Sequence, residues 1–206
     1  MNPNPLLDFT DLPRFDAIRP EHVTPAVSEL LAAANEALER AVSEAVPADY
    51  EALSAVLDVA TERLGRAWGA VSHLNSVADS PALRAAYNEN LPRITEFHTR
   101  LGADERLYAK YKAVAASPAA RELRPARRRA LSNAIRDFVL SGAELRGQAK
   151  VRFAQIQERQ AELSQKFSEH ILDATDSWSM LASAEQLAGV PDGAPAAMRA
   201  AAEADA

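Results

Sequence analysis

The chain has 206 residues, 48% of them hydrophobic and 25% charged, which is typical of a globular protein long enough to bury a sizeable core. It contains no cysteine, which excludes disulfides, thiolate metal sites and a cysteine nucleophile. The formal net charge of -6 disfavours nucleic acid as the main partner, and no apolar run approaches the roughly 20 residues that span a membrane. The first residues lack the basic start and apolar run of a secretion signal, so we expect a soluble, cytoplasmic protein.

Residues 1–23 contain proline at short intervals and are expected to form an extended arm over a helical body. Thr24 and Pro25 then predict a helix start, with Thr24 as N-cap and Pro25 in the first turn. Apolar residues at three- and four-residue steps continue this amphipathic helix until shortly before Pro47. The apolar anchors of the arm are Leu6, Leu7, Phe9, Leu12, Phe15 and Ile18.

A second helix is predicted from about residue 49 to about residue 74 by the same spacing of apolar residues. Gly65 and Gly69 lie four residues apart on it, which predicts that another helix approaches closely there. Ser80 and Pro81 repeat the helix-start signal. The helix that follows contains Pro92, which is expected to kink it, and a further helical stretch ends near Pro118.

Arg124 and Pro125 begin the next predicted helix, for which Gly142 is a suitable C-terminal cap. The last long helix is expected over about 148–174. Its apolar stripe consists of Phe153, Ile156, Leu163, Phe167 and Ile171.

The stretch after this helix, "SWSMLAS", departs from the helical period and predicts a short strand near 178–182 that has no partner within the chain. A short helix, a turn and an Ala-rich helix are expected after it. The fold class is therefore all-α, a multi-helix bundle of long antiparallel helices with a Pro-rich N-terminal arm and this one strand-like segment.

The common catalytic motifs are missing from the sequence. No His-Glu-x-x-His or reversed His-x-x-Glu-His pair occurs, and there is no Gly-rich phosphate loop or Gly-x-Ser-x-Gly elbow. We therefore assign no catalytic, cofactor-binding or metal-binding residue to this chain.

The polar stretch from His73 to Ser80 is interpreted as a joint between two helices. Asn75, Ser76 and Asp79 are common turn residues, Ser80 is a suitable N-cap, and His73 can bond the last carbonyls of its own helix. A catalytic serine and histidine need an orienting group and an oxyanion site, neither of which the sequence identifies.

Six arginines lie close together between residues 121 and 136. They suit an anion site, such as one for a peptide carboxylate or RNA phosphates. The preferred interpretation is a solvated helix face paired with Glu122, Asp137 and nearby acids, because the chain is acidic and the cluster has no interleaved aromatics. The six are Arg121, Arg124, Arg127, Arg128, Arg129 and Arg136.

Two histidine clusters allow chemical alternatives. His98, Arg100 and Gly102 partly match the order found in histidine phosphotransfer bundles, although a partly buried helix histidine is the simpler interpretation. His170 and Asp173 are neighbours three residues apart and follow Glu169, but a metal site needs three or four ligands, so a surface hydrogen bond is favoured.

Several stretches together resemble the N-terminal region of the thimet oligopeptidase family of zinc metallopeptidases. They occur in the family's order and spacing over nearly the whole chain, and they include "SHLNSVADSPALRAAYNENLP", "LSNAIRDFVLSGAEL" and "LSQKFSEHILDATDSW". The resemblance implies a longer, cytoplasmic parent enzyme that hydrolyses short peptides, with zinc held in a C-terminal catalytic domain. Endopeptidase and dipeptidyl carboxypeptidase activity both remain open for that parent.

The resemblance also implies a domain organisation. Residues 1–23 would form the arm, 24–175 the helical body, and 176–206 the segment leading to the catalytic domain, which would be the main partner of this chain. The region would form one wall of a channel that admits short peptides, and a chain without its catalytic half is expected to self-associate through exposed apolar surface. The alternatives are a stand-alone helical peptide- or protein-binding module and a phosphotransfer bundle using His98.

Overall fold

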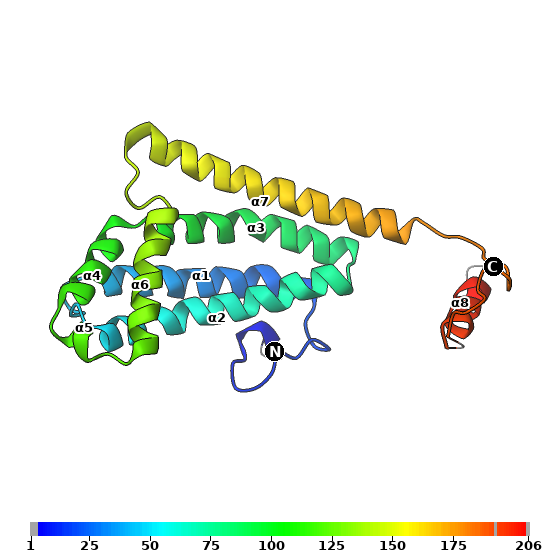
Figure 1. The fold of residues 1–206 in the computed structure, drawn as a ribbon, viewed down its shortest axis with the longest axis horizontal. Helices are drawn as coiled ribbons and strands as arrows, with labels where there is room; N and C mark the ends of the chain where they lie inside the picture. The colour runs from blue at the N-terminus through cyan, green and yellow to red at the C-terminus, as the bar shows by residue number, and fades with distance from the viewer. Residues whose placement is uncertain (1–3, 192, 205–206) are drawn as a thin grey trace. The chain divides into compact units, whose positions relative to one another are not determined.

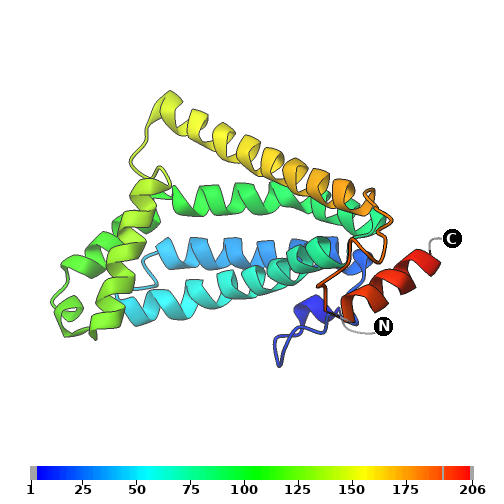
Figure 2. The ribbon, with the colours of Figure 1, turned by 45° about the vertical axis from the view of Figure 1, so that its right-hand side comes forward.

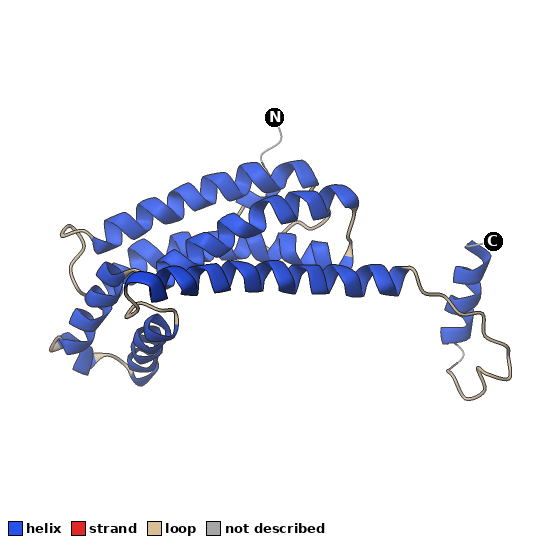
Figure 3. Ribbon diagram, turned by 90° about the horizontal axis from the view of Figure 1, so that it is seen from above, coloured by secondary structure: helices blue, strands red, loops and turns tan. Residues whose placement is uncertain are grey.

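The computed structural model describes residues 4–191 and 193–204 and contains, within them, helices and connecting segments but no strand (Figures 1 and 3). The all-α prediction is confirmed. Residues 1–3 of the predicted arm and residues 192, 205 and 206 of the predicted C-terminal segment lie outside the described residues. The chain divides into two compact units, one reaching to Ser164 and the other beginning at Gln165.

Three long antiparallel helices, side by side in both views, form the centre of the first unit (Figures 1 and 2). They are α1 (Pro20–Val42), α2 (Tyr50–Val77) and α3 (Pro81–Gly102). The second and third start where a side chain caps the first turn: Asp49 accepts a hydrogen bond from the Ala52 amide, and Ser80 accepts one from the Leu83 amide. The Ser80 cap was predicted from the sequence.

Shorter helices follow at one end of the three (Figure 1). Their bounds are α4 (Glu105–Ala116), α5 (Ala119–Glu122) and α6 (Pro125–Leu140). The remaining elements are the 3-10 turn η1 (Pro5–Leu7), α7 (Gly147–Asp176) and α8 (Gly193–Ala204). No helix in the described part of the chain combines the length and apolarity needed to cross a bilayer.

The first long helix begins earlier than predicted. Arg19, not Thr24, is its N-cap, and the His22 imidazole accepts a hydrogen bond from the Arg19 amide at 3.0 Å. Thr24 cannot act as a cap because its hydroxyl faces α3, where it accepts a hydrogen bond from Asn90 at 2.8 Å. Pro25 therefore lies inside α1 rather than in its first turn.

The predicted apolar stripes of the first helices form two buried clusters. The first joins Leu6 and Ile18 of the arm to the first half of α1, the second half of α2 and α3. The second joins the end of α1 and the start of α2 to α4 and α6. Burying a side chain of leucine size stabilises a fold by about 1.5–3 kcal/mol, so these clusters dominate the stability of the unit. The arm anchors Leu12 and Phe15 remain exposed.

Gly142 ends α6 as predicted. Its φ of +88° is in the left-handed region that favours glycine, and the Ala143 amide donates to the Phe138 carbonyl at 2.9 Å. The end of α6 lies against α3, where a Cβ on Gly102 would lie 2.8 Å from the Ser141 Cβ. Gly102 is thus the glycine at which two helices approach closely.

Gly65 and Gly69 do not serve the purpose predicted for them. Apart from the backbone of its own helix, a Cβ built on either one would meet no atom of the described residues within 4 Å, so no helix approaches there. Pro92 lies inside α3, which continues through it, and the predicted kink stays a prediction.

The predicted strand near 178–182 does not form. Residues 178–183 are irregular, and the side chains of Trp178, Met180 and Leu181 are largely exposed. A strand requires a neighbouring strand to pair its backbone groups, and the described residues provide none. The short helix expected next is a series of turns over 184–190, whereas the Ala-rich helix is present as α8.

Candidate functional site

The first unit contains a groove of about 610 Å³ between α3, the end of α6 and the start of α7. This volume is within the range of small-molecule and peptide sites. The close approach at Gly102 and the sharp turn at Gly142 position its walls. Aromatic and aliphatic side chains line it together with hydroxyl, amide, carboxylate and imidazole groups. These include Trp68, Ile94, Thr95, His98, Thr99, Asp137, Ser141, Phe153 and Gln157.

His98 is on the α3 wall of this groove. Its ring lies edge-on to that of Phe97, with 5.4 Å between the ring centroids. Desolvation by neighbouring atoms lowers the pKa of His98 below its ordinary value of about 6.5, so the neutral imidazole predominates at pH 7. The sequence indicated a partly buried histidine; the side chain is more exposed than that, although neighbouring atoms still desolvate it.

The residues that suggested phosphotransfer next to His98 have structural contacts. The Arg100 guanidinium donates to the Asn35 side-chain oxygen on α1, and Gly102 permits the contact with Ser141. These contacts favour the structural interpretation of the motif, because Arg100 is held against α1 by this bond.

The stretch from His73 to Ser80 is a joint between helices, but a shorter one than predicted. The second helix continues to Val77, so His73 lies within it and packs edge-on against Phe15 with 5.4 Å between the ring centroids. Ser80 caps α3 through its hydroxyl. Neither contact joins His73 to Ser80, so the two give no support to a serine–histidine catalytic pair.

The burial of Asn75 was not predicted, because Asn75 and Asp79 were both interpreted as turn residues. Asn75 is buried, and within the described residues its side-chain oxygen and one carboxylate oxygen of Asp79 have no hydrogen-bond partner. The other carboxylate oxygen of Asp79 pairs with Arg84 at 2.5 Å. The sequence signal was available, since Asn75 follows the buried Val71 by one helical turn.

Asn90 is the second buried polar residue and was also missed. Its amide nitrogen donates to the Thr24 hydroxyl and to the Ala86 carbonyl, each at 2.8 Å, and its oxygen accepts from Arg93 at 2.8 Å. The spacing would have revealed it, because Asn90 continues the three- and four-residue steps that bury Tyr87 and Ile94.

The arginine cluster is only partly paired. Arg127 forms an ion pair with Glu51 and lies over the ring of Tyr50, and Arg136 pairs with Asp137 at 3.2 Å. Within the described residues no ion pair holds the others, and the predicted partner Glu122 has none either. The unpaired arginines are Arg121, Arg124, Arg128 and Arg129, all of them exposed.

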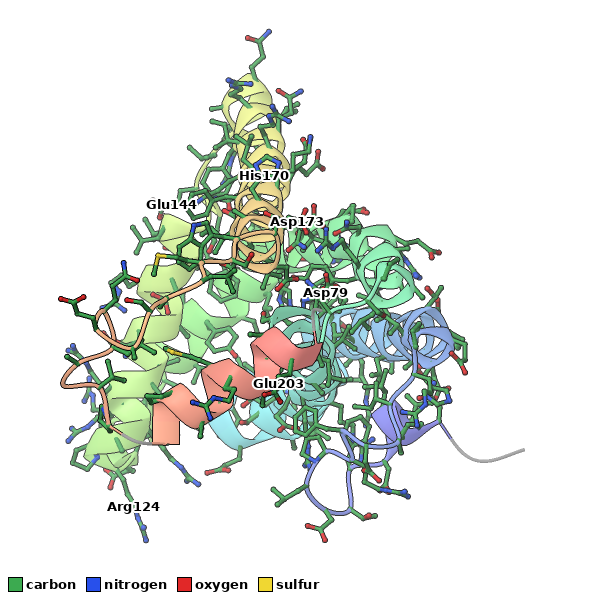
Figure 4. All side chains as sticks on the ribbon, turned by 90° about the vertical axis from the view of Figure 1, so that its right-hand side faces the viewer. Asp79, Arg124, Glu144, His170, Asp173 and Glu203 are labelled. Atoms are coloured by element: carbon green, nitrogen blue, oxygen red, sulfur yellow. The ribbon has the colours of Figure 1, made fainter. Side chains whose placement is uncertain are left out.

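The described residues do not fit a zinc ion. They contain no group of three histidine, aspartate or glutamate side chains placed to hold a metal, and a structural or catalytic zinc needs at least three protein ligands. His170 and Asp173 lie about one turn apart on α7 (Figure 4), and Glu169 accepts a hydrogen bond from Gln165 at 3.2 Å. Any zinc chemistry would therefore require residues outside the described part of this chain.

Comparison with known proteins explains the resemblance seen in the sequence. The family model for the N-terminal domain of neurolysin/thimet oligopeptidase matches residues 27–150, which is more than half of the chain. The chain belongs to this family. The match covers most of α1, all of α2 to α6 and the first residues of α7, so it includes the α3 and α6 walls of the groove but not Phe153 and Gln157 on its α7 wall.

Relatives of this thimet oligopeptidase-type domain are named oligopeptidase A. The protein from Salmonella typhimurium is 43% identical over 202 residues, and that from Escherichia coli K12 is 42% identical over 202 residues; each alignment covers 98% of this chain. A probable cytosolic oligopeptidase A from Arabidopsis thaliana is 36% identical over 94% of the chain. The chain spans about 30% of the length of the two bacterial relatives.

Proposed function

We propose that this chain is the helical N-terminal domain of an oligopeptidase A-like zinc metalloendopeptidase that hydrolyses short peptides in the cytoplasm. The observation that carries the proposal is the similarity to oligopeptidase A along 98% of the chain, at 42–43% identity. The chain itself would cleave no bond. It would shape the access to a catalytic domain elsewhere in the protein and pack against that domain.

The surface of α7 supports a role in domain packing. None of its residues is buried, and the exposed side chains include Ile156, Leu163, Phe167 and Ile171. A helix with an apolar stripe normally buries that stripe against another element. The catalytic domain is the partner that this proposal assigns to the stripe, and residues 1–23, 24–175 and 176–206 remain the proposed arm, body and connecting segment.

The groove supports a role in admitting substrate. It offers apolar surface from Ile94 and Phe153 next to hydrogen-bonding groups from Thr95 and Gln157, and extended peptides carry both kinds of group. No common catalytic motif occurs in the sequence, so we assign the groove a role in shape and contacts rather than in bond cleavage.

The test is to follow the natural reading frame past Ala206 and to assay its product. We expect the frame to encode His-Glu-x-x-His and the product to cleave a quenched fluorescent peptide of about ten residues, with cleavage lost on chelation and restored by zinc. The 206-residue chain is the matched control and should show no cleavage. A stop codon directly after Ala206, or a full product without metal-dependent cleavage, would refute the proposal.

The groove also favours the second candidate, a stand-alone peptide-binding module. In that case the 206-residue chain would bind peptides by itself and would need no catalytic domain. Titration of labelled peptides against this chain and its Phe153→Ala variant distinguishes the two cases, since the stand-alone module requires saturable binding that the variant weakens.

A further inference from the structure

The junction of α5 and α6 is positively charged, although the chain as a whole is acidic. Five arginines lie within Arg121–Arg129, a segment that we call the arginine corner, and its only acidic residue is Glu122. Arg127 is paired with Glu51, while Arg121, Arg124, Arg128 and Arg129 form no ion pair within the described residues. The whole chain has a net charge of -6, so the corner is a local positive surface on an acidic protein.

The backbone adds to the positive charge of the corner. Arg124 is the N-cap of α6, its side chain makes no capping hydrogen bond, and the first turn contains no acidic residue. The free amide groups and the helix dipole at this end favour an anion. Figure 4 shows Arg124 pointing away from the ribbon, where a partner can reach it. Arg124 and Arg128 are also one turn apart and repel each other, a cost that a bound anion would remove.

The dimensions of the corner limit the partner. Residues 124–129 of a helix rise by about 8 Å, which two or three residues of an extended peptide span. A long polyanion such as RNA would extend beyond the corner, and a chain with a net charge of -6 disfavours it. Binding of single-stranded nucleic acid also relies on exposed aromatic rings, and the nearby Tyr50 ring lies under the guanidinium of Arg127, 5.9 Å from its centroid.

We propose that the arginine corner binds acidic peptide segments, those with two to four neighbouring aspartate or glutamate residues. The planar guanidinium group matches a carboxylate with two parallel hydrogen bonds, and several such groups lie within one short surface here. The proposal builds on the proposed function, because acidic peptides are then the substrate class that this domain concentrates near the catalytic part of the protein.

The test uses the 206-residue chain and a fluorescein-labelled peptide with four consecutive glutamates, with the glutamine version as its counterpart. In about 20 mM salt, anisotropy should report binding of the glutamate peptide that is at least tenfold tighter than that of the glutamine peptide, and about 200 mM salt should weaken it. The double variant Arg124→Gln/Arg128→Gln should weaken binding about five- to tenfold, because each exposed ion pair contributes modestly.

The matched control is the double variant Arg136→Gln/Arg159→Gln. It removes the same charge from two arginines that are already paired, with Asp137 and Glu162, and it should keep the affinity of the unmodified chain. Equal binding of the two peptides, equal loss in both double variants, or tighter binding of an RNA oligomer or anionic vesicle would overturn the proposal. Hydrolysis does not enter this readout, so failure here is distinct from failure of the peptidase assignment.

Discussion

At the scale of single residues, Asn90 connects α1 and α3 through a side chain that is fully buried. Its amide nitrogen donates a hydrogen bond to the Thr24 hydroxyl, and its amide oxygen accepts one from Arg93. Arg93 also donates to Ser28 on α1 at 3.0 Å. A polar residue in this position restricts how the two helices can slide, since any other register would leave the amide unpaired.

The Asn90→Ala variant is therefore expected to lose about 2 kcal/mol of the free energy of unfolding, from the unpaired groups and the small cavity together. Urea unfolding measures the loss. Glu96→Ala, on the exposed side of the same helix, is the control and should change the free energy by less than about 0.5 kcal/mol. Equal effects of the two substitutions would show that the Asn90 contacts contribute nothing.

His98 makes the stability of the fold depend on pH. Desolvation by neighbouring atoms lowers its pKa in the folded chain, so below about pH 6.5 the unfolded chain binds the proton more readily. Stability should then fall as the pH drops from about 7.5 to 5.5, and the His98→Gln variant should show a smaller fall because its side chain does not titrate. Urea midpoints at the two pH values test this, and a variant with an equal or larger fall would contradict it.

At the scale of elements, the two kinds of glycine in the chain should respond oppositely to substitution. Gly142 has a φ of +88°, and a Cβ there would lie 3.0 Å from a side-chain carbon of Leu145. Gly65 is in an exposed helix interior with open space around it. Gly142→Ala is expected to destabilise the fold by about 1–2 kcal/mol, and Gly65→Ala to stabilise it by up to about 1 kcal/mol.

Thermal or urea unfolding of the two variants decides this prediction by its sign. If Gly65→Ala were destabilising in the isolated chain, a segment of the described helices would have to approach α2 more closely than the structure places it. If Gly142→Ala were neutral, the turn after α6 would not require the left-handed conformation.

Local signals were sufficient to predict most elements but not every boundary. The periodicity of apolar residues predicted the long helices, and the serine cap at Ser80 is confirmed. The start of α1 was wrong because Thr24-Pro25 and Arg19-Pro20 are both possible starts. The choice depends on Asn90, whose amide engages the Thr24 hydroxyl from a helix 66 residues away. Propensity and capping rules cannot predict a contact between residues so far apart in the sequence.

At the scale of the whole molecule, the exposed stripe of α7 shows another limit of local pattern. Periodicity predicts which face of a helix is apolar, but not whether this chain contains the surface that covers it. The groove was likewise missed, because its walls come from helices separated in sequence, whereas the absence of a catalytic motif was evident from the sequence alone. The same reasoning explains why the predicted strand near 178–182 does not form, since a strand depends on a partner strand.

The exposed stripe leads to a prediction for the 206-residue chain in solution. Side chains such as Leu163 and Phe167 are 49% and 66% exposed, and apolar surface of this kind favours association. Sedimentation at increasing concentration should give a weight-average mass above the 22.3 kDa of one chain. The double variant Leu163→Gln/Phe167→Gln should return the mass toward one chain, whereas Arg159→Gln/Lys166→Gln on the same helix should not. A monomer at all concentrations would contradict the prediction and would mean that α7 shields its apolar face without a partner.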